Sequence, residues 1–399
     1  MKNSTLAKKR KPAKSKSSKE APLKKKDLKD FSVGVSTSNR LLSLDLFRGA
    51  TMFLLVAEST RLYNHFTTYT SEPGFLHSLA LQFHHHPWNG LRFWDLIQPF
   101  FMFIVGVAMV FSLTKRVSRP RDWSMATHHI IKRCFILFFL GVLLHCVYSG
   151  TLVWELWNVL TQLAFTILIA FSLFKYSLRT QILVSFGLLL LTEILYRFFP
   201  VEGFNNPFVM GENFGSWMDM VLMGKINGGG WVVINFLPTA AHTIWGVVAG
   251  KILISDWKAI EKVKPLIIAG LIGLVVGYGM DLAGVTPIIK RIATTSFVIV
   301  SGGWCLLVLA ACYWLVDVLG YKRFVFFFSV VGMNSIFIYM FAETIGHQWL
   351  VGFAAIFSEF FLWLNASEAT VNISAALIAL AINWYLCYWL YKNKIFFKV

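Results

Sequence analysis

LIIAGLIGLVV at residues 266–276 and LVSFGLLLL at residues 183–191 decide the fold of this 399-residue chain. A helix built from either stretch is apolar on nearly every face, as a segment that faces lipid must be. The whole chain is 56% hydrophobic and only 14% charged, with a mean hydropathy of +0.62. A soluble domain could not cover so much apolar surface with so few charges. We therefore expect an all-α, polytopic helical membrane protein without a soluble domain of useful size.

Apolar runs of about 20 residues, the length that crosses the hydrocarbon of a bilayer, recur along the chain. They predict about ten transmembrane helices. An amphipathic segment at 348–363 is expected to form an additional interfacial or re-entrant helix. The ten predicted spans are 44–66, 95–114, 130–148, 155–174, 180–199, 232–253, 265–284, 294–315, 324–344 and 371–391.

Basic residues are distributed unequally between alternate loops. Loops after the second, fourth, sixth and eighth spans are rich in Lys and Arg, whereas the opposite loops hold few, chiefly Arg92, Lys225, Lys290 and Arg291. Because Lys and Arg accumulate on the cytoplasmic side, we expect both termini to be cytoplasmic. The loop around residue 85 and the long loop 200–231 would then face the extracytoplasmic side.

The net charge of +17 does not indicate a nucleic-acid-binding protein, because thirteen of the 37 Lys and Arg residues lie before residue 41. This Ser-, Lys- and Pro-containing segment has too few apolar residues to fold. We expect residues 1–40 to be a disordered, basic cytoplasmic tail that rests on anionic lipid. Residues 41–399 would form the transmembrane domain.

The segment FHHHPWNG at residues 83–90, with Asp95 after it, is an imidazole-rich loop between two apolar runs. A histidine at such a position can accept and release a proton near neutral pH. Adjacent loop histidines are, however, commonly only solvated. A metal site is not expected, because the three histidines lack partners with a known ligand spacing, and the five cysteines are widely spaced in apolar segments.

The first span carries the charged residues Asp45, Arg48 and Glu58, and charges inside a membrane are costly. Asp45 and Arg48 are three positions apart and can pair on one helix face. They form either an interfacial ion pair or the polar wall of a cavity. Asp95 opens the second span, where a carboxylate favours the helix dipole and can also hold the imidazole of His85.

Several segments resemble the heparan-alpha-glucosaminide N-acetyltransferase family of the transmembrane acyltransferase group, and they extend from about residue 40 to 345. The chain looks closer to the compact bacterial members, because no lumenal domain precedes the first span. This likeness implies an integral protein of a bacterial inner membrane. The segments are SLDLFRG at 43–49, His85 with WNG at 88–90, Asp95-Leu96, PFF at 99–101, Phe103-Ile104, Gly106, Leu237-Pro238, Gly246, Ala249-Gly250, Ser296-Phe297, GMNSI at 332–336, Tyr339 and Glu343.

The resemblance implies transfer of an acetyl group from cytoplasmic acetyl-CoA to an extracytoplasmic sugar, an amino sugar or an envelope glycan. It implies His85 as the base or the acyl carrier, since it stands three residues before the Trp of Trp-Asn-Gly. Asp95 or Asp45 would orient the imidazole. The residues expected to bind the acceptor or the oxyanion are Arg48, Glu58, Trp88, Asn89, Asn334 and Glu343, and those expected to bind the CoA phosphates are Lys115, Arg116, Lys132 and Arg133.

One position departs from the family pattern: Gln162 stands where an Arg is usual in the fourth span. Two other classes of function stay open. The chain could be a transporter or flippase of a small solute or lipid-linked sugar, or a scaffold that keeps an inactive acyltransferase fold. The acceptor cannot be named from the sequence, and a homodimer is left open.

Overall fold

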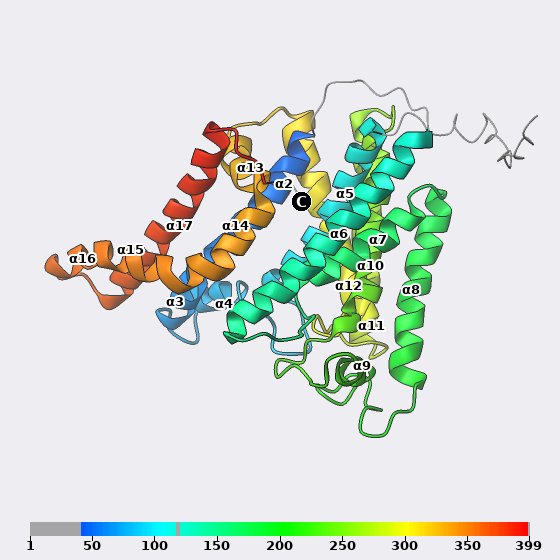
Figure 1. The fold of residues 1–399 in the computed structure, drawn as a ribbon, viewed down its shortest axis with the longest axis horizontal. Coiled ribbons are helices and arrows are strands. Elements are labelled where there is room, and N and C mark those ends of the chain that lie inside the picture. Colours follow the sequence, from blue (N-terminus) through cyan, green and yellow to red (C-terminus); the bar gives the residue numbers. More distant parts are fainter. Residues whose placement is uncertain (1–40, 117–119, 398–399) are drawn as a thin grey trace, which may run out of the picture. The chain divides into compact units, whose positions relative to one another are not determined.

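The computed structural model describes residues 41–116 and 120–397, so the predicted basic tail lies outside the described residues. The described part is built from helices joined by loops (Figure 1). Eight of its helices are long and apolar enough to cross a membrane. The predicted class, an all-α polytopic membrane protein, is confirmed.

The long helices follow one another in the order in which the apolar runs occur in the sequence. They are α2 (Leu42–Ser59), α5 (Ile97–Arg116), α6 (Pro120–Ser149), α7 (Val159–Leu173), α8 (Leu178–Phe198), α10 (Phe236–Ile254), α11 (Ala259–Leu282), α12 (Thr295–Tyr313) and α17 (Glu368–Lys392). Shorter elements connect them: α3 (Leu62–Thr68), α4 (Phe75–Leu81), η1 (Phe93–Leu96), α9 (Phe214–Met223), η2 (Val233–Asn235), η3 (Trp314–Val318), α13 (Val325–Met333), α14 (Ser335–Phe341), η4 (Ala342–Leu350), α15 (Val351–Ser358) and α16 (Phe360–Trp363).

The first span is shorter than predicted, because α2 ends at Ser59 and not at residue 66. The hydroxyls of Ser59 and Thr60 donate to the carbonyls of Val56 and Ala57 one turn earlier. Arg61 then adopts a left-handed backbone conformation with φ 63°, and α3 begins at the next residue. Glu58 is therefore at the end of the helix, close to the loops.

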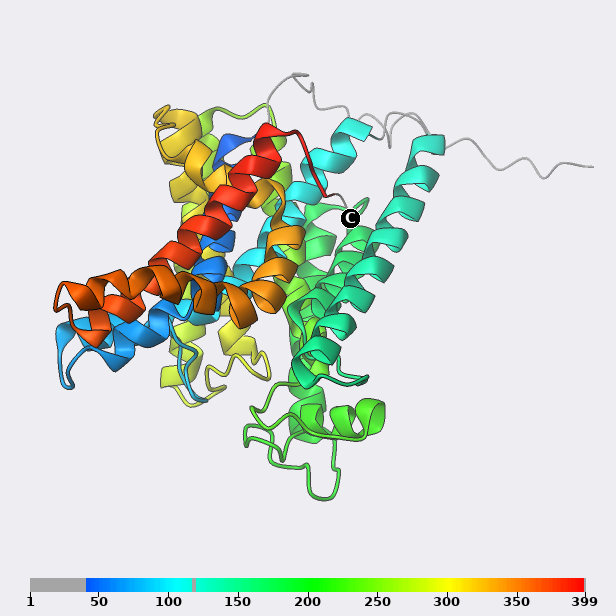
Figure 2. The same ribbon diagram turned by 60° about the vertical axis from the view of Figure 1, so that its left-hand side comes forward.

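The predicted ninth span is interrupted, since α13 and α14 meet at Asn334, whose backbone is not helical. After this break the helical run continues without a loop through the π-helix η4 to Trp363. The prediction of a span ending at residue 344 and a separate helix at 348–363 is wrong. Both belong to one helical run, which turns near η4, so that α15 and not α14 lies beside α17 (Figures 1 and 2).

Small residues bring the central helices close together. A Cβ atom added to Gly106 of α5 would lie 2.0 Å from the carbonyl oxygen of Thr243 on α10, and Gly246 of α10 faces the Phe103 carbonyl in the same way. On another pair, a Cβ at Gly49 of α2 would lie 2.1 Å from the carbonyl oxygen of Phe328 on α13. These backbone approaches fix α2, α5 and α10, the helices that carry the polar residues described below.

Candidate active site

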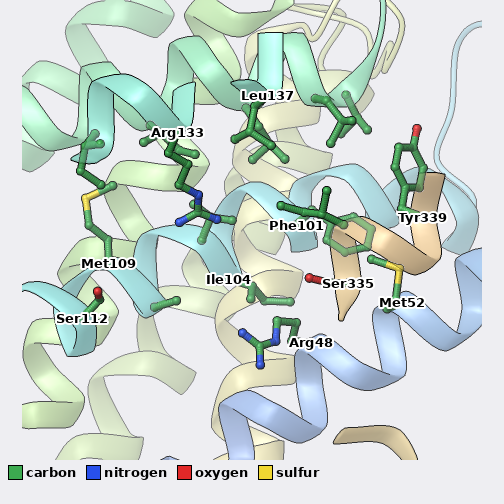
Figure 3. Close-up of a pocket in the computed structure, with 18 of the residues that line it drawn as sticks. Arg48, Met52, Phe101, Ile104, Met109, Ser112, Arg133, Leu137, Ser335 and Tyr339 are labelled. Atoms are coloured by element: carbon green, nitrogen blue, oxygen red, sulfur yellow. The ribbon is translucent and has the colours of Figure 1, made fainter. Parts of the chain in front are cut away.

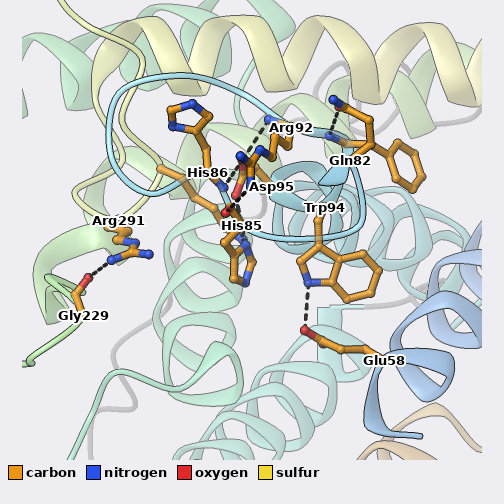
Figure 4. A network of polar contacts seen from close by, with 11 residues as sticks. Glu58, Gln82, His85, His86, Arg92, Trp94, Asp95, Gly229 and Arg291 are labelled. Atoms are coloured by element: carbon orange, nitrogen blue, oxygen red, sulfur yellow. Dashed lines mark hydrogen bonds and ion pairs between the residues drawn. The ribbon is translucent and has the colours of Figure 1, made fainter. Parts of the chain in front are cut away.

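His85 and Asp95 form the centre of the polar loop between α4 and α5. The Nδ1 atom of His85 lies 2.9 Å from Oδ1 of Asp95, whose side chain is 1% exposed. The other carboxylate oxygen accepts hydrogen bonds from the backbone N–H groups of His86 and Arg92, at 3.2 and 2.9 Å (Figure 4). Because Asp95 caps η1 as well as holding the imidazole, its position is fixed by the helix start itself.

Two other loops fix the backbone around His85. The N–H of Gly90 donates to the carbonyl of Ile288 at 2.8 Å, and Asn89 and Ile289 form an antiparallel bridge. The indole N–H of Trp88 donates to the carbonyl of Phe208 in the long loop that follows α8. The Trp-Asn-Gly segment therefore connects its own loop to the other two through hydrogen bonds. Trp88 and Asn89 do not line the cavity described next.

A cavity of about 360 Å³, here called the histidine cavity, lies against the imidazole of His85. The His85 ring packs edge-on against Trp231, with 5.4 Å between ring centroids, and its side chain is about one-third exposed. Polar groups from several helices and loops face this space. They are Glu58, Gln98, His145, Tyr148, Asn158, Gln162, Asn227, Lys290 and Tyr339.

Two carboxylates stand on the wall of this cavity or next to it. Glu58 accepts a hydrogen bond of 3.0 Å from the indole N–H of Trp94, the residue before Asp95 (Figure 4). Glu343 of η4 accepts one of 2.6 Å from the hydroxyl of Tyr148. Both residues were predicted to contact the acceptor, and both belong to the surroundings of His85.

Lys290 is, among the residues of this site that the sequence did not indicate, the one that contacts His85 most directly. It is 6% exposed, lies in the loop between α11 and α12, and its Nζ atom is 3.0 Å from His85 Nδ1. Burial and the adjacent Lys290 ammonium lower the pKa of His85 to about 4, and burial lowers the pKa of Lys290 to about 8. The only signal in the sequence was the adjacent basic pair Lys290 and Arg291, which lies in one of the predicted extracytoplasmic loops, where Lys and Arg are otherwise rare.

The neighbouring histidines have other contacts. His84 Nε2 lies 3.3 Å from both the Thr67 hydroxyl and the Tyr63 carbonyl, on the side of α3. Burial and nearby Arg92 lower the pKa of His86, whose ring packs against Gly90. Within residues 41–116 and 120–397, no three His, Cys, Asp or Glu side chains are grouped as metal ligands would be.

A second cavity of about 420 Å³, here called the arginine cavity, shares the wall residues Leu55, Phe101, Val159 and Tyr339 with the histidine cavity. Arg48 of α2 and Arg133 of α6 reach into it from opposite walls (Figure 3). His129, one turn before Arg133, also lines it. The two cavities therefore adjoin each other inside the helix bundle: imidazole groups and the Glu58 carboxylate line the first, and two guanidinium groups line the second.

Other predicted site residues lie elsewhere. Lys115 and Lys132 are exposed and line neither cavity, and the side chain of Arg116 is outside the described part. Asp45 is 3.1 Å from Arg48 and thirteen positions before Glu58 on α2, about 20 Å along the helix axis, so it does not contact His85. Asn334 binds the C-terminal segment through Ile395 O and Phe397 N.

Comparison with known proteins places the chain beside two enzymes. The heparan-alpha-glucosaminide N-acetyltransferase of Mus musculus is 26% identical over 91% of this chain, and that of Homo sapiens is 25% identical over 90%. The chain is a distant relative of the heparan-alpha-glucosaminide N-acetyltransferases. It spans about three fifths of the length of these curated relatives, 61% and 60% respectively. No protein-family model matches the chain.

This relationship confirms the resemblance drawn from the sequence, as a distant one. The alignments cover nine tenths of the chain. The roles of individual residues, the orientation in the membrane and the homodimer stay predictions.

Proposed function

We propose that the chain is a membrane acyltransferase that moves an acetyl group from acetyl-CoA to an amino sugar or a related glycan. The observation that carries this proposal is a histidine, held by a buried carboxylate, facing a cavity that adjoins a second, arginine-lined cavity. A relationship to N-acetyltransferases supports the acyl group and the class of acceptor. The localisation that we propose is an inner membrane, with both termini cytoplasmic.

The donor would occupy the arginine cavity. CoA carries phosphate groups, and guanidinium groups match phosphate oxygens in charge and geometry. Arg48 and Arg133 would hold the phosphates, and the thioester would reach toward the wall shared with the histidine cavity. Arg133 thus keeps the role in CoA binding that the sequence suggested, and Arg48, which was expected to bind the acceptor, is assigned to CoA as well. Lys115 and Lys132 are exposed and would contribute only to the positive charge of their surface.

His85 supplies the proton chemistry. With its Nδ1–H donating to Asp95, its Nε2 has a free lone pair and can act as a general base. Nε2 accepts the proton of the acceptor amine or hydroxyl as that atom attacks the thioester carbonyl. The C–S bond then breaks, and the proton passes from Nε2 to the departing sulfur. Alternatively, Nε2 attacks the thioester and carries the acetyl group before the acceptor takes it.

Amides on the cavity wall would stabilise the oxyanion that forms in either route. Gln98, Asn158 and Asn227 line the histidine cavity, whereas the residues expected from the sequence, Asn89 and Asn334, bind other parts of the chain. Preorganised donors of this kind contribute several kcal/mol to acyl transfer.

The test is turnover by the purified protein in detergent. Acetyl-CoA is supplied with and without glucosamine, free thiol is followed with a chromogenic reagent, and acetylated sugar is identified by mass spectrometry. We expect both products in equal amounts with the wild type and neither above background with His85→Ala. Absence of acetyl-CoA binding up to millimolar concentration would contradict the proposal and favour transport of a solute or an inactive fold.

A further inference from the structure

Lys290 reaches His85 from a loop 205 positions away in the chain. The bridge between Asn89 and Ile289 and the hydrogen bond from Gly90 N to Ile288 O place the two loops side by side. As a result, Lys290 Nζ lies 3.0 Å from His85 Nδ1 and 3.8 Å from Asp95 Oδ1. Two charged groups of opposite sign therefore contact the same ring nitrogen.

A single imidazole nitrogen cannot satisfy both partners at once. In the plane of the ring, Nδ1 carries either a hydrogen or a lone pair. The Asp95 carboxylate can only accept, so it requires the hydrogen, whereas the Lys290 ammonium can only donate, so it requires the lone pair. The two contacts are alternatives, and they correspond to opposite tautomers of His85.

We propose that Lys290 is a positioning residue for His85: it competes with Asp95 for Nδ1, thereby selecting the tautomer, and its charge opposes protonation of the imidazole. The inference rests on the proposed acyltransferase function. When Lys290 bonds to Nδ1, the proton is on Nε2 and the base is blocked. When Lys290 turns to Asp95 alone, Nδ1–H donates to the carboxylate and Nε2 is available.

The charge of Lys290 also affects the second half of the reaction. Once Nε2 has taken the acceptor's proton, an imidazolium stands about 3 Å from an ammonium, and the two repel. This repulsion favours release of the proton to the departing CoA sulfur. The acceptor's N–H or O–H bond breaks, an S–H bond forms, and His85 returns to its neutral state, so no other reactant is needed.

Other ionisable groups face this pair and enter its pH dependence. Asp95, Glu58 and Arg291 act on Lys290 through their charges, and His145, Tyr148 and Tyr339 stand on the walls of the same cavity. Arg291 provides a matched control. Its guanidinium, like the Lys290 ammonium, lies over the Trp231 ring, at 5.8 and 5.2 Å from the centroid. It donates to the Gly229 carbonyl, and its charge lowers the pKa of His85 less than that of Lys290 does.

The first test measures the protonation of His85 directly, without any need for activity. Protein with isotope-labelled histidine is titrated by NMR, and His85→Gln identifies the His85 signal. In the wild type we expect a midpoint near pH 4, in keeping with the lowered pKa of His85. Lys290→Met, which removes the charge and nearly keeps the volume, is expected to raise this midpoint by about one pH unit or more. Lys290→Arg and Arg291→Gln are expected to change it by less than half as much.

The second test is the pH dependence of kcat/KM for the same four proteins. The acid limb is expected to move upward in Lys290→Met by the same amount as the NMR midpoint, while Arg291→Gln follows the wild type. An unmoved midpoint in Lys290→Met, or an equal shift in Arg291→Gln, would overturn the inference, as would a midpoint shift without a matching shift of the acid limb. A wild type without transfer activity would contradict the proposed function, and the NMR titration would still decide the role of Lys290.

Discussion

The hydrogen bonds of one imidazole decide which of the three adjacent histidines can act as a base. His85 is held by Asp95 and faces a cavity, His84 contacts the Thr67 hydroxyl and a backbone carbonyl, and His86 packs against Gly90. A base needs both a partner that fixes its tautomer and a free nitrogen directed at the substrate. In the described structure, His85 is the one of the three that combines a carboxylate partner with a place on the wall of the histidine cavity.

Substitution of the three histidines should therefore have unequal effects. His85→Ala is expected to lower acetyl transfer by about 10²–10⁴-fold, the usual contribution of general acid–base catalysis. His84→Ala and His86→Ala should each cost far less, and Asp95→Asn should fall between, because it loses the carboxylate that orients the imidazole and caps η1. The measurement is the transfer rate at matched expression and thermal stability. Equal losses from all three histidines would point to a shared cluster instead.

Two adjacent basic residues of α6 separate a binding role from a surface role. Arg133 lines the arginine cavity, whereas Lys132 is exposed. Arg133→Gln is expected to weaken acetyl-CoA binding by about tenfold or more, as the loss of a charge-assisted hydrogen bond to phosphate would. Lys132→Gln should leave the dissociation constant within about twofold. Titration calorimetry with acetyl-CoA and with CoA compares the two variants, and equal losses would argue for a general effect of surface charge.

The close contacts between helices depend on small residues. Gly106 and Gly246 let α5 and α10 approach so closely that a Cβ at Gly106 would collide with a backbone carbonyl. Several glycines in the segments that resemble acetyltransferases, Gly49 and Gly332 among them, have this role in packing. Their presence therefore reflects the architecture that holds the site, and by itself it does not indicate chemistry.

A pair of glycine substitutions tests this interpretation. Gly106→Ala would place a methyl group 2.0 Å from the Thr243 oxygen, so the helices must separate, at a cost of about 1–3 kcal/mol or more. Gly187→Ala is the control: nothing lies within 4 Å of its added Cβ, and alanine favours a helix over glycine by about 1 kcal/mol. We expect a lower thermal midpoint in detergent for the first and an unchanged or higher one for the second. An unchanged midpoint in Gly106→Ala would show that α5 and α10 adjust freely.

Features that depend on residues close together in the sequence could be predicted, whereas contacts between distant segments could not. Apolar run length indicated the helical class, and the ten-residue separation of His85 and Asp95 allowed their contact to be expected within one loop and helix start. Lys290 could not be predicted in the same way, because its approach depends on a bridge between loops far apart in sequence. Run length also failed at Ser59 and Asn334, where side-chain hydrogen bonds and a single non-helical residue set the helix boundaries.

In the proposed mechanism the chain has to bring a donor and an acceptor to His85, and the proposed orientation gives each its own side of the membrane. Basic residues gather at the loops that the sequence assigns to the cytoplasm, and His85 lies at the opposite ends of the helices. Because Lys and Arg are retained on the cytoplasmic side, the arginine cavity would lie nearer to the cytoplasmic donor. The histidine cavity would then be nearer to an extracytoplasmic acceptor.

Accessibility of single cysteines in whole cells tests this orientation. The five native cysteines are first replaced by alanine, which breaks no disulfide because none of them forms one in the described structure. A cysteine is then placed at Phe75, which is 81% exposed on α4, or at Lys322, which is exposed between η3 and α13. A membrane-impermeant maleimide should label position 75 in intact cells and position 322 only after permeabilisation, since the charge asymmetry puts these loops on opposite sides. The reverse pattern would place His85 on the cytoplasmic side and remove the reason to propose transfer across the membrane, while leaving the His85 and Lys290 predictions in force.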